Sequence, residues 1–227
     1  YVNPTQFGPD EDFENYPRRL ESDLQKCEKE GVHAVFAPSD EEMYTSERFL
    51  SIQIDEMADQ MCGAHREGHF EGVLLVVNKL FNIVDPDVAA FGQKDIQQFV
   101  LIQRMVIEFN HAVELLIAPI QRANDGLALS SRNTYLSDEE RVKAPSLYRS
   151  LGYVKQQIQN GVYQPELLMG HQKGELEAKG FEIDYFGIYD FYTLKPVTAL
   201  EKGNNYIIAI AAYLGSTRLI DNMLIEL

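Results

Sequence analysis

The stretch VAAFGQKD, residues 88–95, decides the fold that the sequence predicts. Its first four residues form a short apolar run, which is typical of a buried strand, and Gly92 follows directly. A helical pattern with apolar residues along one face then covers residues 95–110. Residues 112–117 form a second apolar run. Strand, helix and strand in this order predict a parallel sheet covered by helices.

The chain before this stretch continues the same alternation. Residues 16–31 show helical spacing with Gly31 as the C-terminal cap, and residues 32–36 form an apolar run that predicts a buried strand. Residues 70–84 predict a buried helix. Residues 1–2 read like the end of a strand, so we expect further chain to precede them. The predicted fold class is α/β, a Rossmann-like doubly wound parallel sheet with helices on both faces.

The pattern changes after Pro119. A polar loop over residues 122–133 is followed by helical patterns, the last of them over residues 165–179. Three strand-like segments then lie close together without intervening helices: residues 183–194, 206–214 and 217–224. Such a series predicts a small C-terminal α+β domain with an antiparallel sheet. We place the Rossmann-like domain at residues 1–121 and the C-terminal lid domain at residues 122–227.

Composition limits the classes of function. The chain has 227 residues, 45% of them hydrophobic, and a formal net charge of −15. Nucleic acids and anionic membranes repel such a body, whereas a few local basic side chains can still bind a nucleotide. The two cysteines, Cys27 and Cys62, have no metal-type spacing, and no apolar run is long enough to span a bilayer. We expect a cytoplasmic protein with no nucleic-acid or membrane partner.

The residues that follow the strand at 88–91 carry the sharpest chemical signal. Gly92 lets a ligand approach the backbone, and the free N–H groups of a helix start favour an anion. Lys94, after Gln93, adds a mobile positive charge. The alternative is an ordinary turn, in which Asp95 caps the helix and Gln98 completes the cap. The residues alone leave both interpretations open.

The loop over residues 125–133 is a second candidate. Ser130, Ser131 and Arg132 offer donors and positive charge to phosphate oxygens, and Gly126 allows the loop to move. The alternative is a solvated linker between domains, in which Ser, Asn and Asp serve turns.

A third candidate follows the N-terminal residues. The amide of Gln6, in the segment NPTQF, can bind a hydroxyl or a carboxylate without bringing charge. The alternative is a plain turn that leaves Gln6 exposed.

The histidines give no further site by spacing. The segment HREGH, residues 65–69, has one residue more than the His-x-Gly-His phosphate signature and does not follow a buried strand, so we reject it as the nucleotide site. No metal-ligand spacing, nucleophile elbow or Cys–His pair stands out.

Taken in order, these segments resemble the pantothenate synthetase family along nearly the whole chain. The matching stretches are YVNPTQF at 1–7, YPR at 16–18, VFAPS at 35–39, EMY at 42–44, GHFEGV at 68–73, KLFNIV at 79–84, FGQKD at 91–95, QQ at 97–98, DGLALSSRN at 125–133 and TRLIDN at 217–222. Each motif alone is weak, but the ordered series is highly specific.

The resemblance implies an ATP-dependent ligase. ATP and pantoate would form a pantoyl-adenylate, which the amine of β-alanine then attacks to give pantothenate, AMP and pyrophosphate. By the resemblance, Gln6 and Gln98 hold pantoate, Gln6 also borders β-alanine, and Lys94 is catalytic. It assigns ATP binding to Gly92, Gln93, Lys94, Asp95, Gln121 (through its backbone), Leu129, Ser130, Ser131 and Arg132. It also implies Mg²⁺, a homodimer through the larger domain, and two catalytic histidines in a segment before Tyr1.

Two positions depart from the family pattern, and two alternatives stay open. Thr45 and Glu67 stand where the family has Pro at turns, so we expect altered loops at these positions. A related nucleotidyltransferase would share the sheet and the Ser-Ser-Arg loop. A non-catalytic nucleotide-binding module would lack the two histidines.

Overall fold

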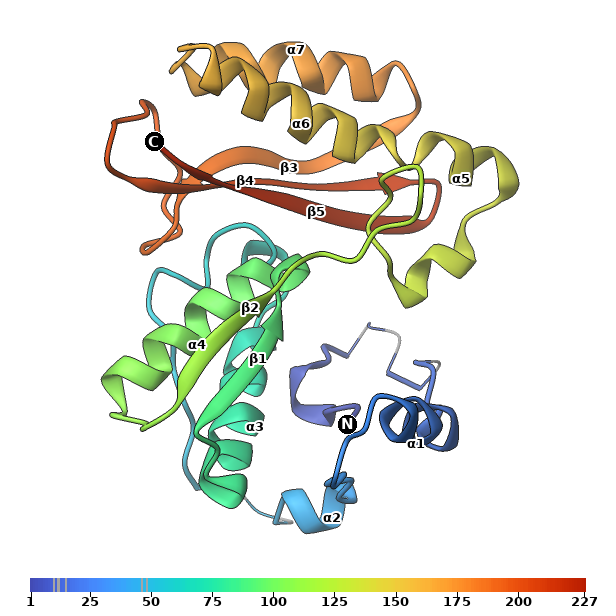
Figure 1. Cartoon of the computed structure of the whole chain (residues 1–227), viewed down its shortest axis with the longest axis vertical. Coiled ribbons are helices and arrows are strands. Elements are labelled where there is room, and N and C mark those ends of the chain that lie inside the picture. Colours follow the sequence, from blue (N-terminus) through green and yellow to red (C-terminus); the bar gives the residue numbers. More distant parts are fainter. Residues whose placement is uncertain (10, 12, 15, 46, 48) are drawn as a thin grey trace.

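The structure is a computed structural model that describes residues 1–9, 11, 13–14, 16–45, 47 and 49–227 (Figure 1). The helices are α1 (Leu20–Lys29), α2 (Asp40–Met43), α3 (His69–Val84), α4 (Ile96–Glu108), α5 (Asp138–Lys143), α6 (Ser146–Gln159) and α7 (Pro165–Glu177). The strands are β1 (Val88–Gly92), β2 (Glu114–Ala118), β3 (Phe181–Asp190), β4 (Asn205–Leu214) and β5 (Thr217–Glu226). Short 3-10 turns are η1 (Pro4–Gln6), η2 (Gly63–His65), η3 (Gln93–Asp95) and η4 (Ser131–Tyr135).

Residues 69–118, which we call the parallel-sheet region, contain α3, β1, α4 and β2. Strands β1 and β2 pair in parallel, as predicted, from Val88 opposite Glu114 to Gly92 opposite Ala118. Helices α3 and α4 pack against each other and bury one face of this sheet. The outer face stays exposed, with Leu116 46% accessible. Helices on both faces were predicted, but among the described residues only one face is covered.

The strand predicted at residues 32–36 is wrong. These residues have no regular structure, and Val32, Val35 and Phe36 are about half exposed. An apolar run predicts burial only where a neighbouring strand supplies hydrogen-bond partners and a core supplies contacts. Helix α1 ends where the sequence predicted, because Gly31 adopts the left-handed conformation (φ +75°) just beyond it.

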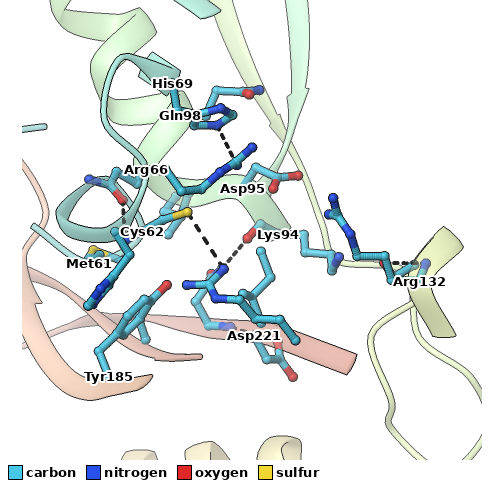
Figure 2. A pocket seen from close by; sticks show the side chains of 18 of the residues that line it. Met61, Cys62, Arg66, His69, Lys94, Asp95, Gln98, Arg132, Tyr185 and Asp221 are labelled. Atoms are coloured by element: carbon cyan, nitrogen blue, oxygen red, sulfur yellow. Dashed lines mark hydrogen bonds between the residues drawn. The ribbon is translucent and has the colours of Figure 1, made fainter. Parts of the chain in front are cut away.

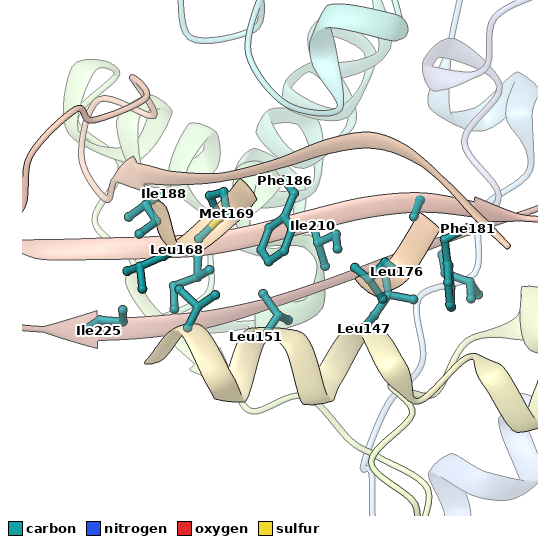
Figure 3. Packing of buried hydrophobic residues seen from close by; sticks show 14 of the residues in the cluster. Leu147, Leu151, Leu168, Met169, Leu176, Phe181, Phe186, Ile188, Ile210 and Ile225 are labelled. Atoms are coloured by element: carbon teal, nitrogen blue, oxygen red, sulfur yellow. The ribbon is translucent and has the colours of Figure 1, made fainter. Parts of the chain in front are cut away.

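Residues 146–226, which we call the antiparallel-sheet region, contain α6, α7 and the sheet β3-β4-β5. Both strand pairs are antiparallel, which confirms the predicted C-terminal sheet. Helices α6 and α7 cover one face (Figure 1). Figure 3 shows how Leu147 and Leu151 of α6 pack with Ile210 and Phe186 of the sheet.

The opposite face of the antiparallel sheet joins the two regions. Tyr189, Ile207 and Ala209 belong to the same buried cluster as the apolar side chains of α3 and α4. Strand β4 is therefore buried on both faces, which explains its continuous apolar sequence. The chain leaves β2 through residues 119–121 and reaches α6 by way of η4 and α5 (Figure 1).

The loop at residues 122–133 is folded rather than an extended linker. Arg122 and Ala128 form an isolated antiparallel β-bridge. The N–H of Ala123 donates to the carbonyl of Leu127 over 2.9 Å. Gly126 has φ +95° and lies against Tyr148, so glycine is required here by backbone conformation and by a close contact. The sequence predicts that Gly126 lets the loop move, whereas in the structure it forms a left-handed turn against Tyr148.

Candidate active site between the two sheets

A cavity of about 510 Å³ lies between the parallel-sheet region and the antiparallel-sheet region (Figure 2). Its wall comes from Glu11, from residues 61–70, from η3 and the start of α4, from Ser130 and Arg132 at the start of η4, and from one face of the antiparallel sheet. Open α/β sheets bind their ligands beyond the carboxyl ends of the strands, and β1 ends at this cavity.

The start of α4 forms one side of the cavity. Lys94, Asp95 and Gln98 all line it (Figure 2). Asp95 occupies the N-cap position, but its side chain makes no capping hydrogen bond. The interpretation of Asp95 and Gln98 as a simple helix cap is therefore wrong, and the N–H groups of the first turn have no side-chain cap.

The ammonium group of Lys94 is partly buried. Burial lowers its pKa below the usual value, while the nearby carboxylates of Asp95 and Asp221 oppose that shift. Among the described residues, no hydrogen bond or ion pair engages its ammonium group. The Lys94 ammonium group can therefore bind an anion that enters the cavity.

Only part of the predicted loop at residues 125–133 reaches the cavity that Lys94 lines. Ser130 and Arg132 line the cavity, and the Ser130 hydroxyl accepts from the N–H of Arg132. Ser131 and Leu129 are exposed and lie outside the lining. Gln121 is also outside the lining, and its carbonyl accepts from the N–H of Leu129 over 2.8 Å.

Three other predicted residues lie at the border of the cavity. Gly92 is exposed, and a Cβ there would meet nothing within 4 Å, so the packing of the chain does not require glycine. The side-chain amide of Gln93 donates to Asn222 of β5 over 3.1 Å. Gln6 is outside the lining, but its carbonyl lies 2.8 Å from Nδ1 of His69, which is in the wall.

The segment at residues 65–69, which the sequence reasoning rejected as a nucleotide motif, lies in the cavity wall. Arg66 binds both carboxylate oxygens of Glu11 over 2.6 Å, and its Nη1 lies 2.9 Å from Nε2 of His69. Burial and the neighbouring guanidinium lower the pKa of His69 to about 4. His69 is therefore neutral at pH 7: it donates from Nδ1 to Gln6 and accepts from Arg66 at Nε2.

The antiparallel sheet supplies a further charged group that sequence reasoning missed. Arg218 of β5 donates to Asp184 over 2.6 and 3.0 Å, and Asp184 also contacts His65 over 3.0 Å. The Sγ of Cys62 lies 3.8 Å from Arg218. These contacts join the two sides of the cavity, and the only sequence signal for them was the position of Arg218 in the matching stretch TRLIDN.

The charge of the lining opposes that of the whole protein. Arg66, Lys94, Arg132 and Arg218 bring four basic side chains to the cavity in a chain of net charge −15. The acidic side chains of the wall are Glu11, Asp95 and Asp221, so basic groups outnumber acidic ones by four to three, and two of the basic groups, Arg66 and Arg218, are themselves in ion pairs. An anionic ligand suits this lining.

A metal site built by the protein alone is absent from the described part of the chain, where no three His, Cys, Asp or Glu side chains converge. Among the acidic residues of the wall, Asp95 alone makes no ion pair with another described residue. Mg²⁺ commonly uses one or two carboxylates together with substrate phosphates, so Asp95 fits an ion that arrives with a polyphosphate.

No helix in the described residues is both long and apolar enough to cross a lipid bilayer.

Comparison with known proteins agrees with this geometry. The family model described as pantoate-beta-alanine ligase matches residues 1–224. A pantothenate synthetase of Pseudomonas fluorescens strain Pf-5 is 47% identical over 100% of this chain and 79% of its own length. One of Thermosipho africanus is 50% identical over 99% of this chain and 80% of its own length.

Solved structures show the same fold. The pantothenate synthetase of Thermus thermophilus superposes with a TM-score of 0.91 at 41% identity, over 98% of this chain and 80% of its own. A pantoate-beta-alanine ligase from Francisella tularensis, complexed with beta-gamma ATP and beta-alanine, gives a TM-score of 0.78 at 31% identity, over 99% and 77% of the two chains. The predicted α/β fold class with an added antiparallel sheet is confirmed. The chain belongs to the pantoate–β-alanine ligase family.

Proposed function

We propose that the cavity between the two sheets is where this ligase joins pantoate to β-alanine at the expense of ATP. The observation that carries the proposal is that Lys94, Gln98, Ser130 and Arg132 line a single cavity, although they come from segments on either side of the crossing at residues 119–121. Its basic lining suits the triphosphate and the carboxylate of pantoate.

The first step forms the adenylate. A carboxylate oxygen of pantoate attacks the α-phosphorus of ATP, and the bond to pyrophosphate breaks. The amino end of α4 and Lys94 stabilise the charge on the phosphates, with Arg132 and Ser130 on the other side. In the second step the amine of β-alanine attacks the acyl carbon, the bond to AMP breaks, and the amine loses a proton. No covalent enzyme intermediate is needed, so positioning and charge stabilisation carry the catalysis.

Gln98 and Gln6 bind pantoate in this proposal. Gln98 lines the cavity one turn along α4 from Lys94, which supports a contact with a substrate held beside the phosphates. The Gln6 amide accepts from Asn3 over 3.1 Å, and its backbone is held by His69. Two bonds thus orient η1 at the border of the cavity, where Gln6 also faces the β-alanine position.

The remaining assignments complete the nucleotide site. Gly92 and Gln93 lie next to Lys94, and the open space beside Gly92 supports close approach of ATP to the backbone. Leu129, Ser131 and Gln121 would contact the nucleotide only after movement of their loop, as expected of a lid over a water-sensitive adenylate. Mg²⁺ arrives with ATP, and Asp95 is the residue that would hold it while the ion neutralises phosphate charge.

The wider context belongs to the same proposal. Residues 1–121 and 122–227 form the nucleotide-binding and lid domains, which the separation into two sheets supports. The protein works as a cytoplasmic homodimer.

Pyrophosphate exchange tests the reaction, with protein produced from the full-length gene. Labelled pyrophosphate should enter ATP only when pantoate is present, and β-alanine should then yield pantothenate and AMP. Exchange that is indifferent to pantoate would favour a nucleotidyltransferase instead. ATP binding without any exchange would indicate a non-catalytic module.

A further inference from the structure

Asn222, in the middle of strand β5, makes an unusual set of contacts with the start of α4. Its Nδ2 donates to the carbonyls of Gln93 and Lys94 over 2.9 and 3.0 Å. Its Oδ1 accepts from the side-chain amide of Gln93 over 3.1 Å. Asn222 is only 2% exposed, so water does not compete for these bonds.

The geometry requires an amide. The carbonyls of Gln93 and Lys94 each accept a hydrogen bond from the Asn222 side chain, and the side-chain amide of Gln93 donates one to it. A carboxamide supplies both within one short side chain, whereas a carboxylate can only accept. In the sheet Asn222 lies opposite Ala209. Its side chain extends from the sheet to the backbone of the parallel-sheet region. The Asn222 amide is thus a direct polar connection between the antiparallel sheet and the backbone that carries Lys94.

The neighbouring residue connects the same strand to the other side of the cavity. The N–H of Asn222 donates to Oδ1 of Asp221, and Asp221 takes two bonds from Arg122 over 2.6 and 2.8 Å. Arg122 also donates to the carbonyl of Gly126 within the loop that leads to Ser130. One strand therefore holds both segments that line the cavity with phosphate-binding side chains.

We propose that Asn222 is a positioning residue of the ATP site, which fixes Lys94 and the amino end of α4 by gripping the carbonyls of Gln93 and Lys94. The inference rests on the proposed function. Asn222 acts through the backbone of Gln93 and Lys94, which precede Gln98 in the chain, so its loss should affect binding and transfer at the phosphates more than pantoate recognition.

The test is steady-state kinetics on Asn222→Asp and Asn222→Ala in the full-length protein. Asn222→Asp keeps the side-chain volume but replaces the donating NH₂ group by a carboxylate oxygen, which cannot donate to the two carbonyls. Both variants should raise the KM for ATP about tenfold and lower kcat for pantoate-dependent exchange by a similar factor, the scale of one or two lost hydrogen bonds. The KM for pantoate should stay within about twofold of wild type, since Gln98 is not displaced.

Matched controls separate positioning from stability. Asn205, on β4 of the same sheet, has a partly exposed side chain that donates to Tyr192 over 3.3 Å, so Asn205→Asp should leave all constants unchanged. A merely structural role of Asn222 would lower the melting temperature and the active fraction with an unchanged KM for ATP; that result overturns the proposal. Where neither Asn222 variant folds, Gln93→Met removes the reciprocal donor from the other side. It should raise the KM for ATP by a smaller factor, and an unchanged value would refute the proposal.

The outcome also distinguishes the two levels of the argument. Wild-type protein without pantoate-dependent exchange contradicts the proposed function itself. Active wild-type protein together with unaffected Asn222 variants contradicts only the role of Asn222.

Discussion

Strand β4 and strands β1 and β2 have similarly apolar sequences but lie in different surroundings. In β4, Ile208 and Ile210 pack beneath α6 and α7, while Ile207 and Ala209 pack against the core of α3 and α4. In the β1–β2 pair, one face packs on the helices and the other leaves Leu116 exposed. The antiparallel-sheet region is thus buried from both sides, whereas the parallel-sheet region is buried from one.

The difference matches the way in which each region contributes to the site. The parallel-sheet region presents Lys94, Asp95 and Gln98 at the end of a strand and the start of a helix, where backbone N–H groups are available. The antiparallel-sheet region presents Arg218 and Asp221 from strand β5, where both are held in ion pairs. We infer that the first region supplies the chemistry and the second a rigid backing.

The largest expected effect tests whether the chemistry belongs to the parallel-sheet region. Lys94→Ala should reduce pantoate-dependent pyrophosphate exchange by a factor of several hundred or more, about 3–4 kcal/mol of transition-state stabilisation. The melting temperature should stay close to wild type, because the ammonium group makes no recorded hydrogen bond to a described residue. Lys155→Ala, which loses a bond to the carbonyl of Leu224 outside the cavity, is the control. Wild-type turnover in Lys94→Ala would refute the role of Lys94.

The next effect tests the rigid backing. Ile210→Ala removes a fully buried side chain, 0% exposed, and should lower the free energy of unfolding by about 3 kcal/mol. Leu116→Ala removes a similar volume from a side chain that is 46% exposed and should lower it by less than about 1 kcal/mol. Urea denaturation of the two variants measures both. Equal losses would show that the two sheets are buried alike in solution.

A pH effect is expected from the parallel-sheet region. His69 has a folded-state pKa of about 4, below its ordinary value of 6.5, so the unfolded chain binds more protons between these pH values. Its contribution to stability is fully present above pH 6.5 and is lost as the pH falls toward 4, by about 2–3 kcal/mol. Urea unfolding measured between pH 4.5 and 7 should show that the free energy of unfolding depends less steeply on pH in His69→Gln than in wild type. The exposed His171→Gln on α7 is the control, and an unaltered slope in His69→Gln would contradict the assignment.

The smallest effect separates two functions along α4. Gln98→Ala should raise the KM for pantoate about tenfold, about 1.4 kcal/mol, with little change in the KM for ATP. Gln97 is the matched neighbour: its side chain holds residues 57–62 through bonds to Cys62, Met57 and Gln60, so Gln97→Ala should chiefly lower stability. If Gln98→Ala raised the KM for ATP more than the KM for pantoate, Gln98 would be assigned to nucleotide binding instead of pantoate binding.

Much of the architecture was predictable where the local pattern and the tertiary surroundings agree. The run at residues 88–91, the helix after Asp95 and the three C-terminal strands form as predicted, with shifted ends. The run at residues 32–36 has the same apolar character, yet it forms no strand. Composition reports the tendency to be buried, whereas a strand also needs a partner in register, which composition does not specify.

The site was predictable only in part, for a similar reason. Lys94, Gln98 and Ser130 carry recognisable motifs, and the structure brings them to one cavity. Arg66 and His69 were set aside because their spacing failed a known signature, although spacing along the chain says little about which wall a side chain joins. Asp221 and Asn222 gave no signal of their own, since an Asp-Asn pair within a strand has many uses.

The order of apolar runs, turn residues and motifs determined that this chain forms an α/β fold of the pantoate–β-alanine ligase family. Only the tertiary structure decided which polar side chains far apart in the chain meet: Asn222 with Gln93, Arg122 with Asp221, Arg66 with Glu11. The physical reason is range. Periodicity and capping depend on neighbours within a few residues, whereas these contacts join residues between 55 and 129 positions apart and depend on how both cores pack.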